Sequence, residues 1–300
     1  MSVGWLRRLS VRVCGLILWL SMGCAQAQIS FMDDAGQTLT LSSPAKRIVS
    51  LAPHITELLY FVGAESSIVG VSEFSDFPEA AKKLPVVGRH DNVDFERLLR
   101  LKPDMVIVWG RGSANAKVDQ MKSLGLRVVY SDPQTLGNIA DNMLWISQLA
   151  GTEATAAAHI ETWRNRLNQL NAAHAEPKVE LSVFYQVWDR PLMTINRQQL
   201  ISQGLQLCGG RNIFADLPLL TPTVSMEAVV RANPDLIVFS KNTAGNANWA
   251  GPWLRWKKVK AVAHQQIIEL PPDLLVRSGP RILDGLEKLC ASMDKARVAP

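Results

Sequence analysis

Two glutamates occupy equivalent positions in a segment that the chain carries twice. Residues 93–108 and 224–239 align at an offset of 131, and the alignment matches Glu96 with Glu227. A carboxylate in the first turn of a helix complements the helix dipole, so one such residue alone would indicate only a stabilised helix. Two at matched places instead predict two similar lobes, each with an exposed acidic group that binds basic residues of a partner.

A second set of candidate residues follows the predicted strands. In open α/β sheets, ligands bind beyond the carboxyl ends of the strands, and aromatic, arginine and aspartate side chains there suit a large organic ligand with polar edges. Loops also carry such side chains without any binding role. The candidates are Pro53, His54, residues 72–77, Gly110, Arg111, residues 188–190, Asp273 and Arg277.

Two histidines, His54 and His90, lie outside the predicted helices and the late loops. Either can be a metal ligand, or an ordinary loop or helix-capping residue. The histidines form no close cluster with the spacing of a zinc site. The sequence also has no Gly-x-Ser-x-Gly, Walker, His-Glu-x-x-His or dinucleotide-binding motif, so nothing in it indicates an enzyme.

The first 27 residues have the pattern of a secretory signal. Three arginines precede an apolar core at 13–19. The small-x-small triplet at 25–27 predicts cleavage after Ala27. A lipoprotein signal that ends at Cys24 is the alternative. This segment has three arginines and no acidic residue, so cleavage lowers the net charge from +5 to +2. Such a small charge gives no reason to expect a nucleic acid partner.

Cys208 and Cys290 are the only cysteines after the predicted signal. In an exported protein, a single pair of this kind predicts a disulfide. The cysteines are 82 positions apart, and closing a loop of that length stabilises a fold by roughly 4–5 kcal/mol at most. Two buried thiols are the alternative.

The strands that must position these residues alternate with helices, which predicts a mostly parallel sheet in each half. A hairpin is expected at 29–41. Further strands are predicted at 47–51, 68–71, 105–109, 127–130, 181–187, 236–239 and 267–270. Residues 53–56 lead into a predicted helix that ends near Gly63. Further helices are predicted at 115–124, 199–208 and 280–293, and after the N-caps Asp94 and Ser225.

The two halves are joined by a stretch, residues 135–175, that lacks strand signals. Thr152 is expected to cap one long helix from Glu153 to about His174, roughly six turns in length. This joint has no proline and is not a Gly/Ser-rich linker, so it predicts small lobe movements on ligand binding.

Several segments resemble motifs of the periplasmic binding proteins of ferric-siderophore and cobalamin importers, most closely those of the cobalamin-binding members. The resemblance runs from about Lys46 to the last helix. It is carried by residues 47–57, 69–72, 75–78, 101–109, 207–214 and 278–282. The resemblance implies an α/β fold with two Rossmann-like lobes bridged by a single long helix. The expected division is a signal at 1–27, an N-terminal lobe at 28–151, a bridging helix at 152–176 and a C-terminal lobe at 177–300.

The resemblance also implies a periplasmic solute-binding protein that is not an enzyme and needs no cofactor. Such a protein, expected to be a monomer, captures cobalamin or a similar metal-bearing macrocycle between its lobes and delivers it to the permease dimer of an ABC importer. Glu96 and Glu227 fall on the positions that dock onto permease arginines, and Cys208 and Cys290 on those of a disulfide. The ligand-facing positions fall at Pro53, Phe74, His90, Trp188, Thr221, Asp273 and Arg277, and His54 lies beside them.

The chain departs from the cobalamin-binding members at two of these positions. His90 and Thr221 stand where those proteins have tryptophans. His90 is a candidate to face the metal of a corrinoid or haem. Haem or a ferric siderophore is therefore the alternative ligand, and an exported enzyme on the same scaffold is the alternative class.

Overall fold

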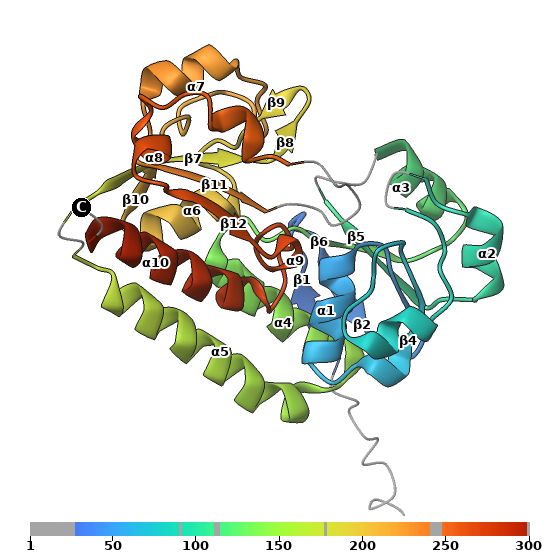
Figure 1. The fold of residues 1–300 in the computed structure, drawn as a ribbon. Helices are drawn as coiled ribbons and strands as arrows, with labels where there is room; N and C mark the ends of the chain where they lie inside the picture. Colours follow the sequence, from blue (N-terminus) through green and yellow to red (C-terminus); the bar gives the residue numbers. More distant parts are fainter. Residues whose placement is uncertain (1–27, 90–91, 111–114, 177–178, 241–247, 299–300) are drawn as a thin grey trace, which may run out of the picture.

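The computed structural model describes residues 28–89, 92–110, 115–176, 179–240 and 248–298. Two parallel four-stranded sheets form the centres of two lobes, which Figure 1 shows next to each other. The N-terminal lobe has the strand order β4-β3-β5-β6 and the C-terminal lobe the order β10-β7-β11-β12. The strands are β3 (Ile48–Ser50), β4 (Ile68–Val71), β5 (Met105–Trp109), β6 (Val128–Ser131), β7 (Leu181–Gln186), β10 (Gly210–Asn212), β11 (Leu236–Ser240) and β12 (Ile267–Leu270).

Helices follow the strands in both lobes, as the alternating pattern predicts. Those of the N-terminal lobe are α1 (Pro53–Phe61), α2 (Phe95–Arg100) and α3 (Asn115–Ser123). Those of the C-terminal lobe are α6 (Leu200–Leu207), α7 (Met226–Ala232), α8 (Lys260–Ala263), α9 (Pro272–Leu275) and α10 (Ile282–Val298). The α/β fold with two lobes is therefore confirmed.

The N-terminal hairpin is confirmed as β1 (Ile29–Met32) and β2 (Thr38–Leu41). Its turn uses Gly36 at φ +76°, a left-handed conformation that glycine adopts without strain. The Asp33 side chain accepts hydrogen bonds from the backbone N–H groups of Ala35 and Gln37 at 3.0 and 2.9 Å. The Asp and Gly residues of this segment therefore form the turn that the sequence predicted.

The duplicated segment folds in the same way in both lobes. Both predicted N-caps are confirmed, because the Asp94 side chain accepts from Arg97 N at 2.9 Å and Ser225 Oγ accepts from Ala228 N at 3.1 Å. Each copy then continues into a central strand, β5 or β11. Each copy of the repeat thus encodes a helix, a turn and a strand, and each helix is capped by a residue within the same copy.

The aspartates at the end of the repeat also have matching roles. Asp104 accepts from the backbone N–H of Arg47 at 3.0 Å, and Asp235 from that of Ser182 at 2.8 Å. Arg47 immediately precedes β3 and Ser182 lies in β7, so each aspartate holds the strand that neighbours its own in register. Burial alone would raise the pKa of Asp235, but hydrogen bonds from Ser182 and Lys260 outweigh it and lower that pKa.

The joint contains two helices where the sequence predicted one. The long helix is confirmed as α5 (Glu153–Ala173), but α4 (Leu136–Ala150) precedes it and was missed. The capping role of Thr152 was wrong. Its hydroxyl is buried and has no hydrogen-bond partner among the residues that the structure describes, and its backbone has ψ 18° where a capping residue is usually extended.

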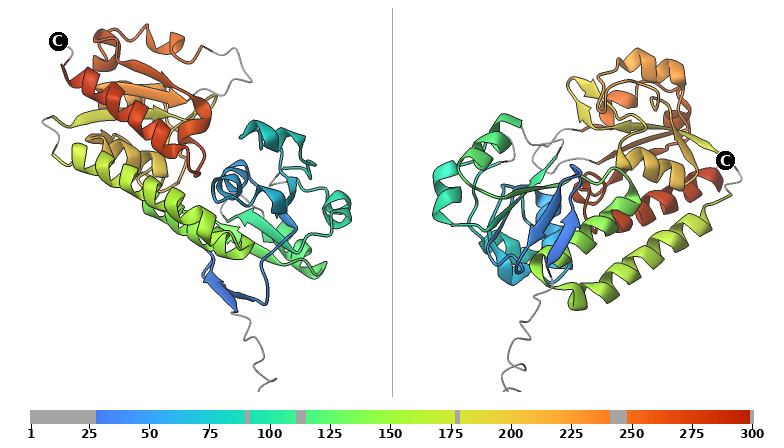
Figure 2. Two further views of the ribbon diagram at one scale, coloured as in Figure 1. Left: turned by 90° about the horizontal axis from the view of Figure 1, so that it is seen from below. Right: turned by 180° about the vertical axis from the view of Figure 1, so that it is seen from behind.

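The two lobes are packed together along this joint. Trp163 of α5 donates its indole N–H to the Pro280 carbonyl at 2.8 Å. Gln203 of α6 accepts from Leu136 N at 3.3 Å and donates to the Gln134 carbonyl at 2.7 Å. One buried apolar cluster runs through both lobes, and the two views of Figure 2 show α5 extending along both of them. The predicted boundaries at 151/152 and 176/177 remain predictions.

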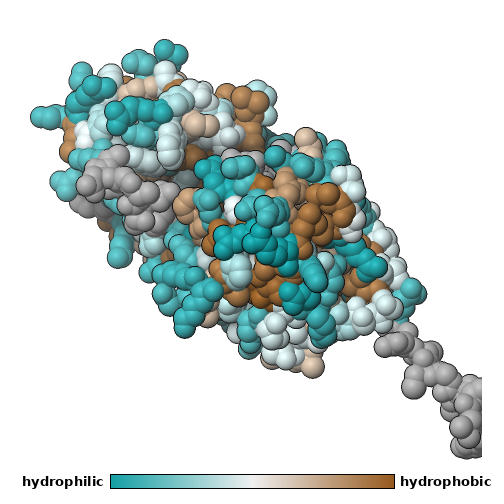
Figure 3. Space-filling view, turned by 90° about the vertical axis from the view of Figure 1, so that its right-hand side faces the viewer, coloured by the Kyte–Doolittle hydropathy of each residue, from teal (hydrophilic) through white to brown (hydrophobic). Residues whose placement is uncertain are grey.

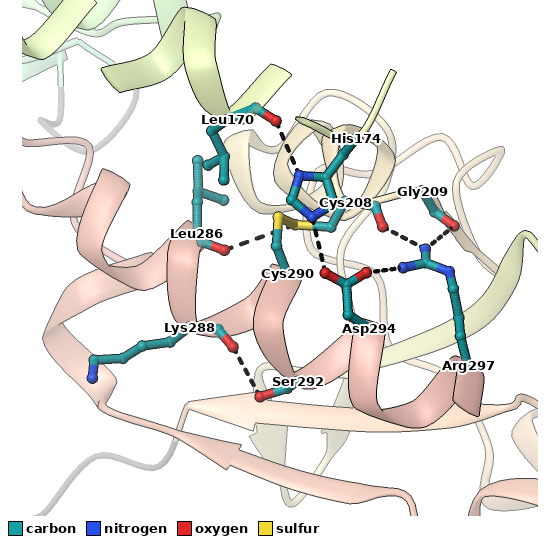
Figure 4. The surroundings of a disulfide bond; sticks show 10 residues. All are labelled: Leu170, His174, Cys208, Gly209, Leu286, Lys288, Cys290, Ser292, Asp294 and Arg297. Atoms are coloured by element: carbon teal, nitrogen blue, oxygen red, sulfur yellow. Dashed lines mark hydrogen bonds and ion pairs between the residues drawn. A yellow bond between two sulfur atoms is a disulfide. The ribbon is translucent and has the colours of Figure 1, made fainter. Parts of the chain in front are cut away.

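The predicted disulfide between Cys208 and Cys290 is present and joins the end of α6 to α10, with a Cα–Cα distance of 4.8 Å. Figure 4 shows the polar contacts around it. His174, at the end of α5, lies 3.2 Å from Asp294 of α10, and Asp294 lies 2.7 Å from Arg297. Arg297 donates to the Cys208 carbonyl. The disulfide and these polar contacts thus connect the C-terminal ends of α5 and α6 to the second half of α10.

Several short elements lie where the sequence predicted only loops. They are the hairpin of β8 (Trp188–Asp189) and β9 (Leu192–Met193), together with β10, α8, α9, η1 (Glu65–Ser67), η2 (Glu79–Lys83) and η3 (Gly251–Trp253). Elements of two to five residues carry too little periodicity to be recognised. The last helix also begins at Ile282 and extends to Val298, beyond the predicted end at 293.

Candidate ligand-binding and docking sites

Arg277 binds three carboxylates where the two lobes meet. It follows α9 in the C-terminal lobe, and its Nη1 donates to Glu57 Oε1 at 3.0 Å and to Asp76 Oδ1 at 2.7 Å in the N-terminal lobe. Its Nη2 lies 3.0 Å from Asp273 Oδ1. The Arg277 side chain is 11% exposed, whereas those of Asp76 and Asp273 are 46% and 43% exposed. A ligand that reaches this guanidinium would meet it together with these two carboxylates.

Arg281 completes a buried ion cluster around Glu57. The Glu57 side chain on α1 is 1% exposed and accepts from Arg281 Nη2 at 2.6 Å and from Nε at 3.0 Å. Arg281 also lies over the ring of Phe77, 3.8 Å from its centroid. A buried carboxylate needs such partners because leaving it unpaired costs several kcal/mol. The cluster therefore fastens α1 to the segment before α10, and with it one lobe to the other.

Asp76 supplies part of the negative charge at this junction. Burial alone would raise its pKa, but the hydrogen bond and the charge of Arg277 outweigh that effect and lower the pKa of Asp76. Asp76 is therefore a carboxylate at neutral pH. Its partial exposure leaves it accessible to a polar group of a ligand.

His54 is buried in the first turn of α1 and is neutral at physiological pH. Burial lowers its pKa from 6.5 to about 4, a hydrogen bond to the Ser131 backbone opposes this, and the charge of Arg277 adds to the lowering. The imidazole lies edge-on to Trp109, with ring centroids 6.0 Å apart. Its Nε2 has no hydrogen-bond partner among the described residues. A neutral imidazole whose other nitrogen donates to a carbonyl can accept a hydrogen bond at this atom.

Two large aromatic side chains, one from each lobe, are exposed. Phe74, in the loop after β4, is 68% exposed and has φ +64°, a conformation that bulky residues rarely adopt and that occurs at functional sites. Trp188, at the start of β8, is 48% exposed. Its ring meets that of the buried Trp249 edge-on, with centroids 6.2 Å apart. Both exposed rings can pack against an apolar ligand face.

The remaining predicted ligand residues fall into two groups. Pro53 begins α1 beside His54, near the ion cluster of Arg277. Thr221 is exposed, two positions before Thr223, which bridges Met193. Met193 in turn pairs with Trp188.

Figure 1 draws the hairpin β8–β9 and helix α9 on the side of the C-terminal lobe that faces the N-terminal lobe. His90 and Arg111, by contrast, lie outside the described residues. The predicted set thus divides into a polar group at the lobe junction and a group around the Trp188 hairpin.

Sequence reasoning missed the residues that complete the junction, namely Glu57, Asp76 as the partner of Arg277, Arg281 and Trp249. A signal was available for Glu57. It is an acidic residue within an apolar helix, between Ile55 and Leu58, and an acidic side chain is seldom buried unless it is paired. Its partners were not predictable, since they lie more than 200 positions away.

Glu96 and Glu227 are exposed in the first turns of α2 and α7, where the sequence placed them. Glu96 forms an ion pair with Arg100 on the same helix. In the part of the chain that the structure describes, Glu227 forms no ion pair with Arg231, which holds the equivalent place in α7. The two candidate docking groups therefore differ in how far their charge is compensated.

The surface near Glu96 is mixed in character. Figure 3 views the molecule from the side on which Figure 1 draws α2, and hydrophobic side chains lie there among hydrophilic ones. Leu99, three residues after Glu96, is 38% exposed. Mixed surfaces of this kind are typical of non-obligate protein interfaces.

The described residues also bear on whether the protein holds a metal ion or crosses a membrane. No group of three or more histidine, cysteine, aspartate or glutamate side chains there is placed to hold a metal ion. Among the same residues, no helix has the length and apolarity that crossing a membrane requires.

Comparisons with known proteins agree on one family. The family model described as periplasmic binding protein matches residues 48–274. The vitamin B12-binding protein of Vibrio cholerae serotype O1 is 34% identical over 255 residues, which cover 85% of this chain and 91% of that protein. The vitamin B12-binding protein of Yersinia pestis is 36% identical over 256 residues, covering 85% and 89%.

Solved structures give the same result. The crystal structure of the periplasmic vitamin B12 binding protein of Vibrio cholerae superposes with a TM-score of 0.78 at 34% identity, covering 85% of this chain and 99% of that one. A periplasmic heme binding protein from Pseudomonas aeruginosa superposes with a TM-score of 0.74 at 25% identity, covering 85% and 94%.

Proposed function

The chain belongs to the periplasmic binding protein family, and on that premise we propose that it captures vitamin B12 between its two lobes and delivers it to the permease of an ABC importer. The observation that carries this proposal is identity of 34–36% to vitamin B12-binding proteins over 85% of the chain. The protein performs no reaction on its ligand. Its task is to recognise the ligand, protect it and present it.

The exposed aromatic residues supply the apolar part of this recognition. Phe74 and Trp188 project from opposite lobes, and each can cover part of a flat macrocycle. A corrin ring also carries amide side chains around its edge. The carboxylates of Asp76 and Asp273 accept hydrogen bonds from amide N–H groups, and Arg277 donates to amide carbonyls. Pro53, His54, His90 and Thr221 complete the proposed contacts.

Delivery requires a second surface on each lobe. Glu96 and Glu227 are exposed and occupy equivalent positions, so a permease dimer with two basic sites can engage both at once. We assign the N-terminal lobe to residues 28–151, the bridging helix to 152–176 and the C-terminal lobe to 177–300. The signal segment directs export and is then removed by cleavage after Ala27, and the exported protein acts as a monomer.

Haem is the second candidate ligand. The similarity to a periplasmic heme binding protein favours it, because the same fold there binds another metal-bearing macrocycle. The departures at His90 and Thr221 from the tryptophans of cobalamin-binding members point in the same direction. A ferric siderophore is the third choice, and an exported enzyme has no supporting motif.

Titration of the ligand-free protein separates these candidates. Cyanocobalamin, haemin and a hydroxamate siderophore are each added while tryptophan fluorescence is recorded, since seven tryptophans follow the predicted signal. Saturable quenching by cyanocobalamin alone, at micromolar concentration or below, supports the proposal. Saturable quenching by haemin alone would identify a haem-binding protein. Consumption of a co-purified ligand would identify an enzyme.

A further inference from the structure

A basic pocket lies on the C-terminal lobe, one helical turn from Glu227. Its cavity volume is about 640 Å³, and its charged lining residues are Arg231, Arg255, Lys257 and Lys258. Arg231 follows Glu227 by four positions on α7, so the two side chains lie on the same face of that helix. The pocket therefore borders the candidate docking group of this lobe.

The four cations of this pocket are exposed and uncompensated. Within the described residues none of them forms an ion pair, and no acidic side chain lines the pocket. Neighbouring cations behave differently, because Lys260 pairs with Asp235 at 3.0 Å. Arg100, the N-terminal counterpart of Arg231, pairs with Glu96. Four unpaired cations around one cavity create a local positive potential that favours an anion.

Trp256 adds a second kind of group to the pocket. Its indole N–H is buried without a hydrogen-bond partner among the described residues, and Arg255 lies 5.5 Å from its ring centroid. Leu254, two positions earlier, is 58% exposed. An indole, an exposed leucine and several cations in one short segment are typical of protein surfaces at a membrane interface.

We propose that this basic pocket binds the phosphate headgroups of anionic phospholipids at the surface of the inner membrane. The four cations attract the charged headgroups, and Leu254 contacts the apolar boundary beneath, with the Trp256 ring between them. An acidic protein surface would use the cations but would not require an exposed leucine beside them. The orientation rests on the proposed docking function, because Glu227 would face the permease beside the lipid.

Vesicle binding tests the proposal with the purified protein. Phosphatidylcholine vesicles with and without phosphatidylglycerol are sedimented with the protein at low and at physiological salt. Binding is expected only to the anionic vesicles and is expected to weaken as salt rises. The double variant Lys257→Gln/Lys258→Gln should bind them about ten-fold or more weakly. Leu254→Ser, which removes the exposed apolar side chain and keeps the cations, should weaken binding less.

A charge-matched control separates the pocket from net charge. Lys288 and Lys295 are exposed on α10, and Lys288→Gln/Lys295→Gln makes the same change in charge elsewhere. This control should bind like the unmodified protein. Equal losses in both double variants, or no binding to anionic vesicles at either salt, overturn the proposal. Loss of uptake in the pocket variant without vesicle binding by the unmodified protein also overturns it, and points to acidic residues of the permease. Titration with cyanocobalamin in free solution reports the proposed function independently of all these outcomes.

Discussion

Arg277 donates a 3.0 Å hydrogen bond to Glu57 across the junction of the two lobes, although the two residues are 220 positions apart in the sequence. Glu57 lies on α1 of the N-terminal lobe and is almost fully buried. Among the described residues, its ion-pair partners are two arginines that follow α9 in the C-terminal lobe. The pairing therefore couples the stability of the fold to the relative position of the lobes.

Replacing Glu57 by glutamine should lower the free energy of unfolding by about 3 kcal/mol, since two partly buried arginines lose their shared, buried partner. Urea denaturation followed by circular dichroism measures this change. Glu96→Gln is the matched control because it removes an exposed ion pair, and it should leave the unfolding midpoint nearly unchanged. Equal effects of the two substitutions would show that the junction contributes no more than a surface pair.

Stability should also depend on pH through His54. Its pKa is lowered to about 4 in the folded protein, so between about pH 6.5 and 4 the unfolded chain binds a proton that the folded protein excludes. The contribution is therefore fully present above pH 6.5 and is lost as pH falls through this window. The difference between the pKa of His54 in the unfolded chain and in the folded protein corresponds to a change of about 3 kcal/mol in the free energy of unfolding.

The measurement is the difference in unfolding free energy between the unmodified protein and His54→Asn at several pH values. The unmodified protein should gain stability relative to the variant as pH rises from 4 to 6.5, and the difference should be constant above that. A difference that does not change with pH would mean that His54 is protonated equally in both states. Carboxylates elsewhere titrate in both proteins and cancel.

Loss of the disulfide should destabilise the C-terminal lobe. Cys208→Ala/Cys290→Ala removes a link between positions 82 residues apart, and the expected loss is about 2–5 kcal/mol. Thermal unfolding with and without a reductant measures it. The reductant should lower the transition temperature of the unmodified protein and leave that of the double variant unchanged. The same response in both proteins would contradict a stabilising role.

Reversal of both docking charges should separate uptake from ligand binding. Glu96→Lys/Glu227→Lys is expected to abolish ligand uptake in cells and to leave the affinity in solution unchanged, because both residues are exposed and neither is among the proposed ligand contacts. Glu153→Lys/Glu161→Lys on α5 makes an equal change in charge and should transport normally. If affinity falls together with uptake, the two glutamates belong to the ligand site or to the fold.

The aromatic contact can be tested at Trp188. Trp188→Ala should weaken ligand binding about ten-fold or more, because a large exposed ring would be lost from the ligand face. Met32→Ala removes another exposed apolar side chain, on the N-terminal hairpin, and should not change affinity. Calorimetric titration gives both values. Unchanged affinity in Trp188→Ala would place the ligand elsewhere.

The sequence was most informative where structure depends on neighbouring residues. The duplicated segment predicted both helix N-caps and both central strands, because a cap is formed within four residues and a buried strand needs only a short apolar run. The same reasoning failed at Thr152, which precedes α5 but has a non-extended backbone and no side-chain cap hydrogen bond.

The sequence by itself determined the two-lobed α/β architecture, the cysteine pair and the exposed glutamates, since each follows from local pattern or from counting. Only the tertiary structure decided the state of the candidate site. Arg277 was predicted to face a ligand, yet it also binds Glu57 and Asp76, residues of the other lobe. No local pattern encodes that pairing, because it exists only where the packing of α4, α5 and α10 brings the two lobes together.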